Sequence, residues 1–390
     1  MMTNDKRFST PDQLGFSLAM VVFLFPFSYH LIEFHTSSVR IIFSTIALGL
    51  AEALGFHPLL SDLSSDSIGL YFHVFAVLIL SLPLFWVLNR SIVSFQKTGI
   101  LFRSFLAWFL AFILLRYGID KLFLKQFPEP EPNLLYTPLG NMDKDILFWT
   151  SMGTSVIFNI VTGIIEVITS VLLIVRKTRT IGVVFSTGIF LQILIINLSF
   201  DISVKLFSTL LLIIAFYLAY PGLQKIWTIL ISHKSVSVPT DIYNVSVVPK
   251  SVRIIFSFLL LTEALYPHLP IRTPLELTLQ GGYACLDDTP EKIRRIFIHS
   301  EGYLIFQNDR DELVDYSAQI NTTRNRIQLS DYDGHKRDIG YHWDNKKEIL
   351  FLYLNSGKPP VRFKRIEHKA LPLLKDSFHF IVDQEVSFKV

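Results

Sequence analysis

Cysteine is almost absent from this chain of 390 residues, which contains one, Cys285. A single thiol cannot form an intramolecular disulfide, a Cys-x-x-Cys redox pair or a thiolate cluster for zinc or iron–sulfur. Any electron chemistry would therefore depend on a bound ligand.

Charge is also scarce. Charged residues make up 18% of the chain, whereas soluble proteins contain about a quarter. The net charge is only +3 and forms no basic stripe, which excludes nucleic acid as a partner. Hydrophobic residues make up 51% and the mean hydropathy is +0.43, which is atypical of an ordinary soluble protein.

The charged residues are unevenly distributed along the chain. Residues 1–270 contain 33 of them, whereas residues 271–390 contain 36. The first region is membrane-like. The second has equal numbers of acidic and basic residues, and it is long enough for one small water-soluble domain.

Seven segments have the length and apolar character of membrane-spanning helices, which need about 17 to 25 residues. They are residues 14–32, 68–88, 99–117, 155–175, 181–200, 203–220 and 253–269. No small-x-small cleavage site follows the first, so we expect an uncleaved span. A further apolar segment, residues 41–56, places Thr45, Gly49 and Glu52 on one helical face, which favours a helix lying in the interface. If it crossed the membrane instead, all later orientations would change.

Lys and Arg concentrate in alternate connections between these segments. Examples are Lys6 and Arg7 before the first, and Arg176, Lys177 and Arg179 after the fourth. Because such connections face the cytoplasm, we expect a bacterial inner-membrane protein with a cytoplasmic N-terminus and a periplasmic C-terminal domain.

After Gly281 and Gly282 the pattern changes to short β runs separated by turn residues. Eight candidate strands are residues 294–300, 303–308, 313–320, 326–331, 337–343, 348–354, 361–367 and 377–383. Their short connections predict an antiparallel meander, either a small open barrel or a curved sheet. The run Arg295–Ile298 predicts one apolar and one wet face.

The histidines of this region have no spacing typical of a metal site. We expect surface or hairpin positions for all of them: His299, His335, His342, His368 and His379.

Glu166 is the clearest polar residue within a predicted span. Near the middle of a helix, a charged side chain costs about 2.5 to 3.5 kcal/mol on insertion scales, so it needs a partner or a function. Asn159 and Gly163 share its helical face. In the next span Gln192 and Asn197 are predicted to be buried amides.

More polar residues lie at the outer ends of the spans. Arg116, Tyr117, Asp120 and Lys121 end the third span, and Asp201 and Lys205 lie between the fifth and sixth. The spacing predicts helical pairs of Arg116 with Asp120 and of Asp201 with Lys205.

Two interpretations of these residues stay open. In one, they line an outer-facing pocket with Glu166 at its floor and Lys121, Arg116 and Lys205 near its mouth. In the other, they are interhelical hydrogen bonds and ion pairs that fix helix packing. A further hypothesis is haem ligation by His30 and His73, which would need two facing imidazoles.

Several runs in the centre of the chain resemble the DoxX-like membrane proteins, which include the membrane-subunit type of thiosulfate:quinone oxidoreductase. The closer resemblance is to a longer variant of Bacteroidetes-type bacteria with extra spans and a β-rich tail. The runs are residues 116–121, 126–128, 148–155, Gly163 with Glu166, 176–180 and 197–205.

The resemblance implies a four-helix unit over residues 99–222. Two spans would precede it in residues 1–98, a cytoplasmic loop and a seventh span would follow in residues 223–270, and a β domain would occupy residues 271–390.

The leading functional hypothesis is a redox or quinone-linked envelope process served by the outer-facing pocket. A quinone needs a hydrogen-bonding group and a flat apolar slot, which Glu166, Lys121 and Tyr117 would supply with neighbouring phenylalanines. The alternative is a non-catalytic scaffold or accessory subunit that contacts lipids and whose β domain binds an envelope partner. The sequence has no nucleotide-binding loop and no nucleophile–base spacing, so it leaves open whether the protein is an enzyme.

Overall fold

The computed structural model describes residues 10–25, 63, 65–91, 95–231, 249–269, 279–355 and 357–375, together with residues 45, 49, 52, 53 and 55. The chain forms two compact units. One contains Met1–Gln126 and Phe158–Leu269, and the other contains Phe127–Ile157 and Pro270–Val390. His30, most of residues 41–56 and the candidate strand 377–383 lie outside the described residues.

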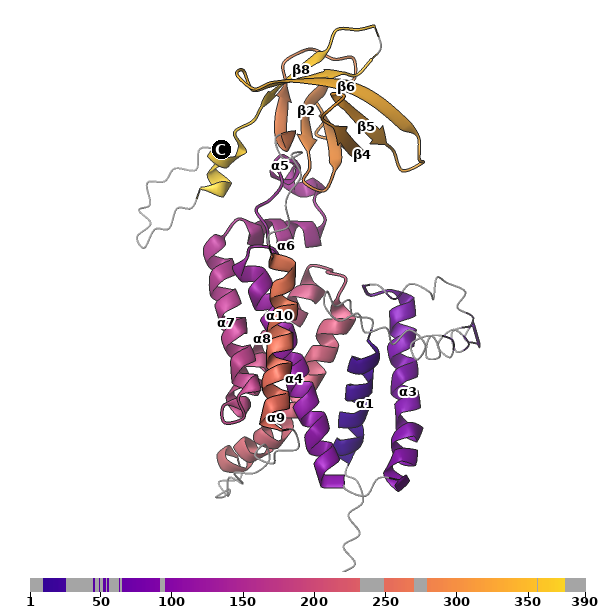
Figure 1. Ribbon diagram of the computed structural model, residues 1–390, viewed down its shortest axis with the longest axis vertical. Helices are drawn as coiled ribbons and strands as arrows, with labels where there is room; N and C mark the ends of the chain where they lie inside the picture. Colours follow the sequence, from indigo (N-terminus) through magenta and orange to yellow (C-terminus); the bar gives the residue numbers. More distant parts are fainter. Residues whose placement is uncertain are drawn as a thin grey trace, which may run out of the picture. The chain divides into compact units, whose positions relative to one another are not determined.

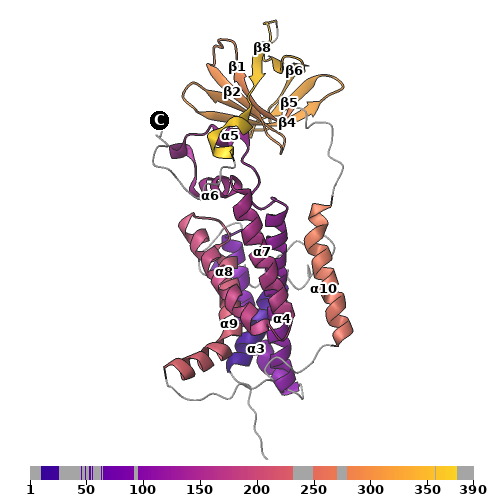
Figure 2. The same cartoon turned by 90° about the vertical axis from the view of Figure 1, so that its left-hand side faces the viewer.

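The first unit is helical, and its main helices run side by side in both views (Figure 1, Figure 2). The helices are α1 (Thr10–Leu24), α3 (Ile68–Ser91), α4 (Phe95–Leu122), α7 (Val156–Ile174), α8 (Arg179–Ser199), α9 (Lys205–Leu230) and α10 (Lys250–Leu265), followed by the 3-10 turn η2 (Tyr266–His268).

Five of these helices, α3, α4, α7, α8 and α9, contain a stretch that is long and apolar enough to cross a membrane. The protein is therefore membrane-associated. Five of the seven predicted spans correspond to helices of sufficient length and apolar composition. Helix α10 has 16 residues, about 24 Å at 1.5 Å per residue, against about 30 Å of hydrocarbon. The first and seventh spans thus stay predictions.

Helix α7 shows how the sequence suits a membrane. Its polar and small residues, including Asn159, Gly163 and Glu166, are buried, while Ile157, Ile168 and many other large apolar side chains are exposed. A water-soluble helix has the opposite arrangement. Small and polar residues in helix–helix contacts, with apolar residues outside, are typical of a helix surrounded by lipid.

The second unit contains a closed barrel in which each strand pairs with the next and β1 pairs with β8, all antiparallel. The strands are β1 (Gly281–Cys285), β2 (Ile293–Ile298), β3 (Tyr303–Asn308), β4 (Leu313–Asn321), β5 (Arg326–Ser330), β6 (Lys336–Asp344), β7 (Ile349–Tyr353) and β8 (Val361–Arg365). The core includes Tyr283, Ile296, Ile339 and Phe363.

The structure corrects the predicted sheet in one respect. Strand β1 lies where the sequence shows only Gly281 and Gly282 as a boundary, and it pairs Tyr283 with Arg365 of β8. This pairing closes the barrel, whereas the sequence predicts an open barrel or a curved sheet. Seven of the eight predicted strands correspond to β2–β8.

A connecting segment of helical turns belongs to the same unit as the barrel: α5 (Pro132–Leu135), η1 (Leu139–Asn141) and α6 (Lys144–Gly153). The sequence interpretation places these residues in the four-helix membrane unit. Figure 1 shows α5 next to the barrel. The Gln307 side chain donates a hydrogen bond to the Tyr136 carbonyl at 3.0 Å, and the Arg295 guanidinium lies 4.4 Å from the centre of the Tyr136 ring.

This segment also corrects the predicted wet face of β2. Phe297 points away from its neighbours Ile296 and Ile298, yet it is only 1% exposed. Its ring stacks with that of Tyr136, the ring centres being 6.1 Å apart. The outer face of β2 is therefore covered at this point.

Candidate functional site

Lys121 of α4 and Glu166 of α7 form a buried ion pair. The Lys121 ammonium donates hydrogen bonds to both carboxylate oxygens of Glu166 at 2.8 Å and to the side-chain oxygen of Gln126 at 2.9 Å. It also lies 5.7 Å from the centre of the Tyr117 ring. The charged atoms thus satisfy one another, as buried ionic groups require.

Two glycines allow this pair to form. A Cβ atom at Gly118 would lie 2.8 Å from the carbonyl oxygen of Gly163, and one at Gly163 would lie 2.8 Å from the carbonyl oxygen of Gly118. Helices α4 and α7 therefore approach too closely for larger residues at this point. Further along α7, the Ser170 hydroxyl donates to the Ala111 carbonyl of α4 at 2.6 Å.

Asp120 belongs to a different contact. Its carboxylate lies 2.7 Å from Nε2 of His268, which follows α10, and the His268 ring stacks on Phe123 at 4.5 Å. The Lys125 ammonium donates to the carbonyl of Pro267 nearby. The sequence predicts a pair of Asp120 with Arg116, but in the structure Asp120 links the ends of α4 and α10. Arg116 is half-buried.

Lys205 and Asp201 form the predicted helical pair at 2.7 Å, and Asp66 completes this site. The Asp66 carboxylate accepts hydrogen bonds from the backbone N–H groups of Lys205 and Leu206 at 2.8 and 3.0 Å. It therefore satisfies free N–H groups in the first turn of α9. Asp66 is absent from the predicted site residues because no local pattern relates it to a helix start 139 residues later.

The two amides of α8 differ in burial. Asn197 is 5% exposed, whereas Gln192, predicted to be buried, is exposed. The reason is helical spacing, because the buried stripe of α8 runs through Ser186, Phe190 and Asn197 and leaves Gln192 on the outer surface.

His73 is also part of a helix contact. It is 1% exposed, and its Nε2 atom lies 3.0 Å from the carbonyl oxygen of Leu24 at the end of α1. This atom is therefore engaged with protein, and the other residue of the haem hypothesis, His30, lies outside the described residues.

The candidate pocket residues thus take part in several helix contacts. Lys121 and Glu166 join α4 to α7, Asp120 joins α4 to the end of α10, and Lys205 joins α9 to Asp66. This arrangement favours the interhelical interpretation of the polar residues.

Two cavities in the described part of the chain belong to the barrel. One of about 630 Å³ is a surface groove with mostly polar residues, such as Asn321, Arg324, Gln328 and Asp338. A second, of about 500 Å³, opens at one end of the barrel, and we call it the barrel mouth.

The barrel mouth combines an apolar floor with a polar rim. The floor consists of side chains of the barrel interior: Ile293, Phe306, Tyr316, Leu329, Ile339 and Leu354. Val314, which is half exposed, lies at the edge of the same cavity. The rim carries the acidic residues Glu291, Glu312 and Asp331 and the basic residues Lys336 and Arg337, together with His335. Apolar cavities with a few convergent polar groups are typical of small-molecule sites.

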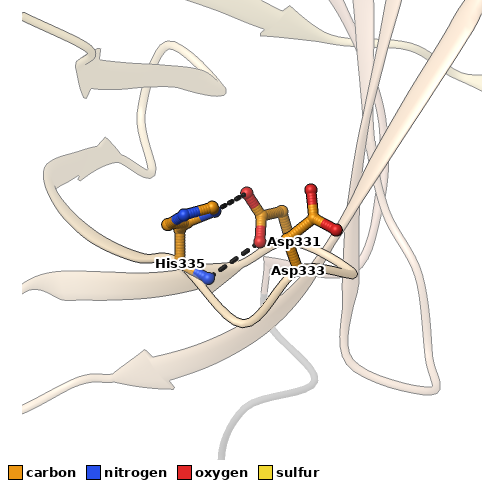
Figure 3. Close-up of side chains that lie close together, drawn as sticks. All are labelled: Asp331, Asp333 and His335. Atoms are coloured by element: carbon orange, nitrogen blue, oxygen red, sulfur yellow. Dashed lines mark hydrogen bonds and ion pairs between the residues drawn. The ribbon is translucent and has the colours of Figure 1, made fainter.

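Three rim and turn residues lie close together between β5 and β6 (Figure 3). Potential ligand atoms of Asp331, Asp333 and His335 lie within 4.8 Å of one another. The Asp331 carboxylate accepts a hydrogen bond from the His335 backbone N–H at 2.8 Å and lies 3.0 Å from the His335 ring nitrogen Nδ1. The turn therefore explains their proximity without an ion.

The same contacts affect the acidity of Asp331. Desolvation raises the pKa of its carboxyl, but the hydrogen bonds from His335 lower it more, so the pKa lies below its usual range. The alternate spacing of Asp331, Asp333 and His335 is the sequence signal for this cluster.

Comparisons with known proteins identify a bacterial relative. The chain is 31% identical over 117 residues to a Bacillus subtilis (strain 168) protein called uncharacterized protein YwoB. The match covers 30% of this chain and 74% of the relative. No family model matches the chain, and no solved structure matches it. The DoxX-like resemblance therefore stays a prediction.

Proposed function

Because the chain belongs to the same family as YwoB, whose name states no activity, we propose a function from geometry: a membrane-anchored binding protein that holds a small ligand in its barrel mouth. One observation carries the proposal. The cavity of about 500 Å³ is lined by residues of the barrel interior.

The shape and lining of the barrel mouth indicate the kind of ligand. Its volume falls in the range of about 300 to 1,000 Å³ that is typical of small-molecule sites. Eight-stranded barrels are wide enough to hold one small ligand. The ligand would place an apolar body against Phe306, Leu329 and Ile339 and a polar group at the rim.

A redox or quinone-linked role of the helices remains a weaker proposal. It would use Glu166 and Lys121 as hydrogen-bonding groups for a quinone. In the structure each is engaged with the other, so a ligand would have to compete with a bidentate ion pair.

The division into two units supports the proposed topology. Residues 127–157 and the barrel belong to one compact unit, so we infer that they lie on the same side of the membrane. Between them the chain contains three helices that can span, α7, α8 and α9, followed by α10. Elements on the same side need an even number of crossings between them, so we propose that α10 crosses together with α7, α8 and α9. The positive-inside rule supports the proposal that the barrel lies in the periplasm.

A pair of neighbouring substitutions tests the binding function. Val314 pairs with Phe306 and lines the barrel mouth, whereas Leu313 points to the opposite face of β4. We expect Val314→Trp to weaken binding of a decanoate probe at least tenfold and Leu313→Trp to leave it unchanged. Native mass spectrometry of the full-length protein measures the bound probe. Equal binding by both variants and the unchanged protein would contradict the proposal.

A further inference from the structure

A second kind of site lies in the helical unit, where three arginines surround a cavity of about 160 Å³. Arg176 lies in the turn between α7 and α8, Arg179 is the first residue of α8, and Arg253 comes from the first turn of α10. The remaining lining comes from α4 and α10, and it includes Phe105, Trp108 and Phe256. We call this site the arginine cavity.

The charges around the arginine cavity are of one sign. No acidic side chain lines it in the part of the chain that the structure describes. Arg179 is 2% exposed, and its Nε atom donates to the carbonyl of Leu173 at 2.9 Å. Since arginine keeps its charge in proteins, this concentration of positive charge favours an anion.

Arg253 carries the strongest indication of a missing partner. Its Nε atom is buried and has no hydrogen-bond acceptor among the described residues. Burying an N–H group without an acceptor costs about 1 to 3 kcal/mol. Desolvation, together with the nearby charge of Arg253, also lowers the pKa of the Arg176 guanidinium. Both observations show guanidinium groups that an anion would stabilise.

The surroundings of the arginine cavity point to a lipid as the source of the anion. Trp108 and Phe256 contact each other edge to face across α4 and α10, with ring centres 5.4 Å apart. On α10, Val252, Ile254 and Ile255 are exposed apolar residues beside Arg253. An acyl chain would therefore find an apolar surface next to the charged groups.

We propose that the arginine cavity binds the phosphate of an anionic phospholipid, whose acyl chains lie along the exposed apolar face of α10. Guanidinium groups bind phosphate through paired, charge-assisted hydrogen bonds. Basic pockets between helices on the cytoplasmic side suit anionic headgroups, and the positive-inside rule predicts that side for this turn.

The test uses the full-length protein in detergent, with thermal unfolding as the readout. Dioctanoyl phosphatidylglycerol should raise the melting temperature, and dioctanoyl phosphatidylcholine should raise it much less. The Arg253→Gln variant should need about ten times more phosphatidylglycerol for the same shift, since one charge-assisted hydrogen bond contributes roughly a factor of ten. Lys250→Gln is the matched control, because Lys250 lies on the same helix turn and does not line the cavity.

The outcomes separate the alternatives. The site is supported if phosphatidylglycerol raises the melting temperature of Arg253→Gln less than that of the unchanged protein, while Lys250→Gln responds as the unchanged protein does. If Arg253→Gln does not fold, Arg176→Gln supplies the same comparison. Equal stabilisation by both lipids, or equal responses of all variants, would overturn the proposal. The same shift with sodium phosphate at equal concentration would overturn the lipid as the source and assign a free anion.

Discussion

At the scale of single residues, the Lys121–Glu166 pair predicts a strongly non-additive mutant cycle. Replacing Glu166 with Leu leaves the buried Lys121 ammonium without its carboxylate, which should destabilise the protein by about 3 to 5 kcal/mol. Replacing both residues, as Lys121→Met with Glu166→Leu, should recover most of this loss because no charge remains buried. Thermal unfolding in detergent measures both effects. A double variant as unstable as Glu166→Leu would show that the pair does not act as one unit.

A second pair, Asp287 and Arg362 of the barrel, predicts a dependence on pH. Hydrogen bonds from the Arg362 side chain lower the pKa of the Asp287 carboxyl below its unfolded value. The stabilisation is therefore complete above the unfolded pKa of about 3.9, and it is lost as the pH falls through the lower folded pKa. Since Asp287 is 25% exposed, we expect less than about 1 kcal/mol.

Denaturant unfolding at pH 7 and pH 2.5 tests this expectation. Asp287→Asn should lower the free energy of unfolding of the barrel at pH 7. It should also reduce the further decrease in this free energy on going from pH 7 to pH 2.5. Asp309→Asn is the control, because Asp309 pairs at 3.3 Å with a Lys292 side chain that is 70% exposed. If the free energy of unfolding of both variants changes equally with pH, the Asp287–Arg362 contact makes no specific contribution to the pH dependence.

At the scale of elements, the crossing of α4 and α7 depends on Gly118 and Gly163. Gly163→Ala should separate the helices and lower the melting temperature, because the added Cβ would lie 2.8 Å from the Gly118 carbonyl oxygen. Gly188→Ala in α8 is the matched control, since a Cβ there meets nothing within 4 Å and should gain up to about 1 kcal/mol of helix propensity. Equal effects of the two changes would exclude a role of close helix approach.

The elements that sequence predicts well are those with strong local patterns. Hydropathy identifies α3, α4, α7, α8 and α9, and alternation identifies β2–β8. Strand β1 is missed because Gly281–Cys285 contains two glycines and no β-branched residue, so its extended form depends on pairing with β2 and β8. The sequence also identifies the polar residues of the helices. It does not predict which contacts they make, because partners such as Asp66 and His268 lie more than 100 residues away along the chain.

At the scale of the whole molecule, closure of the barrel predicts which fragment folds. A fragment of residues 279–375 contains all eight strands, whereas one of residues 290–375 lacks β1 and leaves β2 and β8 as open edges. We expect cooperative unfolding, measured by circular dichroism, for the first and aggregation for the second. Cooperative unfolding of the shorter fragment would show that β1 is dispensable.

The topology also predicts a relation between two reporters. An enzyme reporter inserted at Gly140, an exposed position of η1, and one fused to Val390 should report the same side of the membrane, because both positions belong to the barrel unit. Activity only outside the cytoplasm would agree with the positive-inside rule. Opposite readouts would show that α10 does not cross.

The two-part composition of the barrel unit has a consequence for biogenesis. Within this unit the ribosome makes residues 127–157 first, and it then makes the helices from α7 to α10 before it reaches the strands. Under the proposed topology, the early segment would be exported before its partner strands exist, with Pro132 and the Tyr136 ring not yet covered by the barrel. During this interval the segment would be open to proteases and chaperones outside the membrane, so the nascent protein would pass through a stage of maturation that the finished fold conceals.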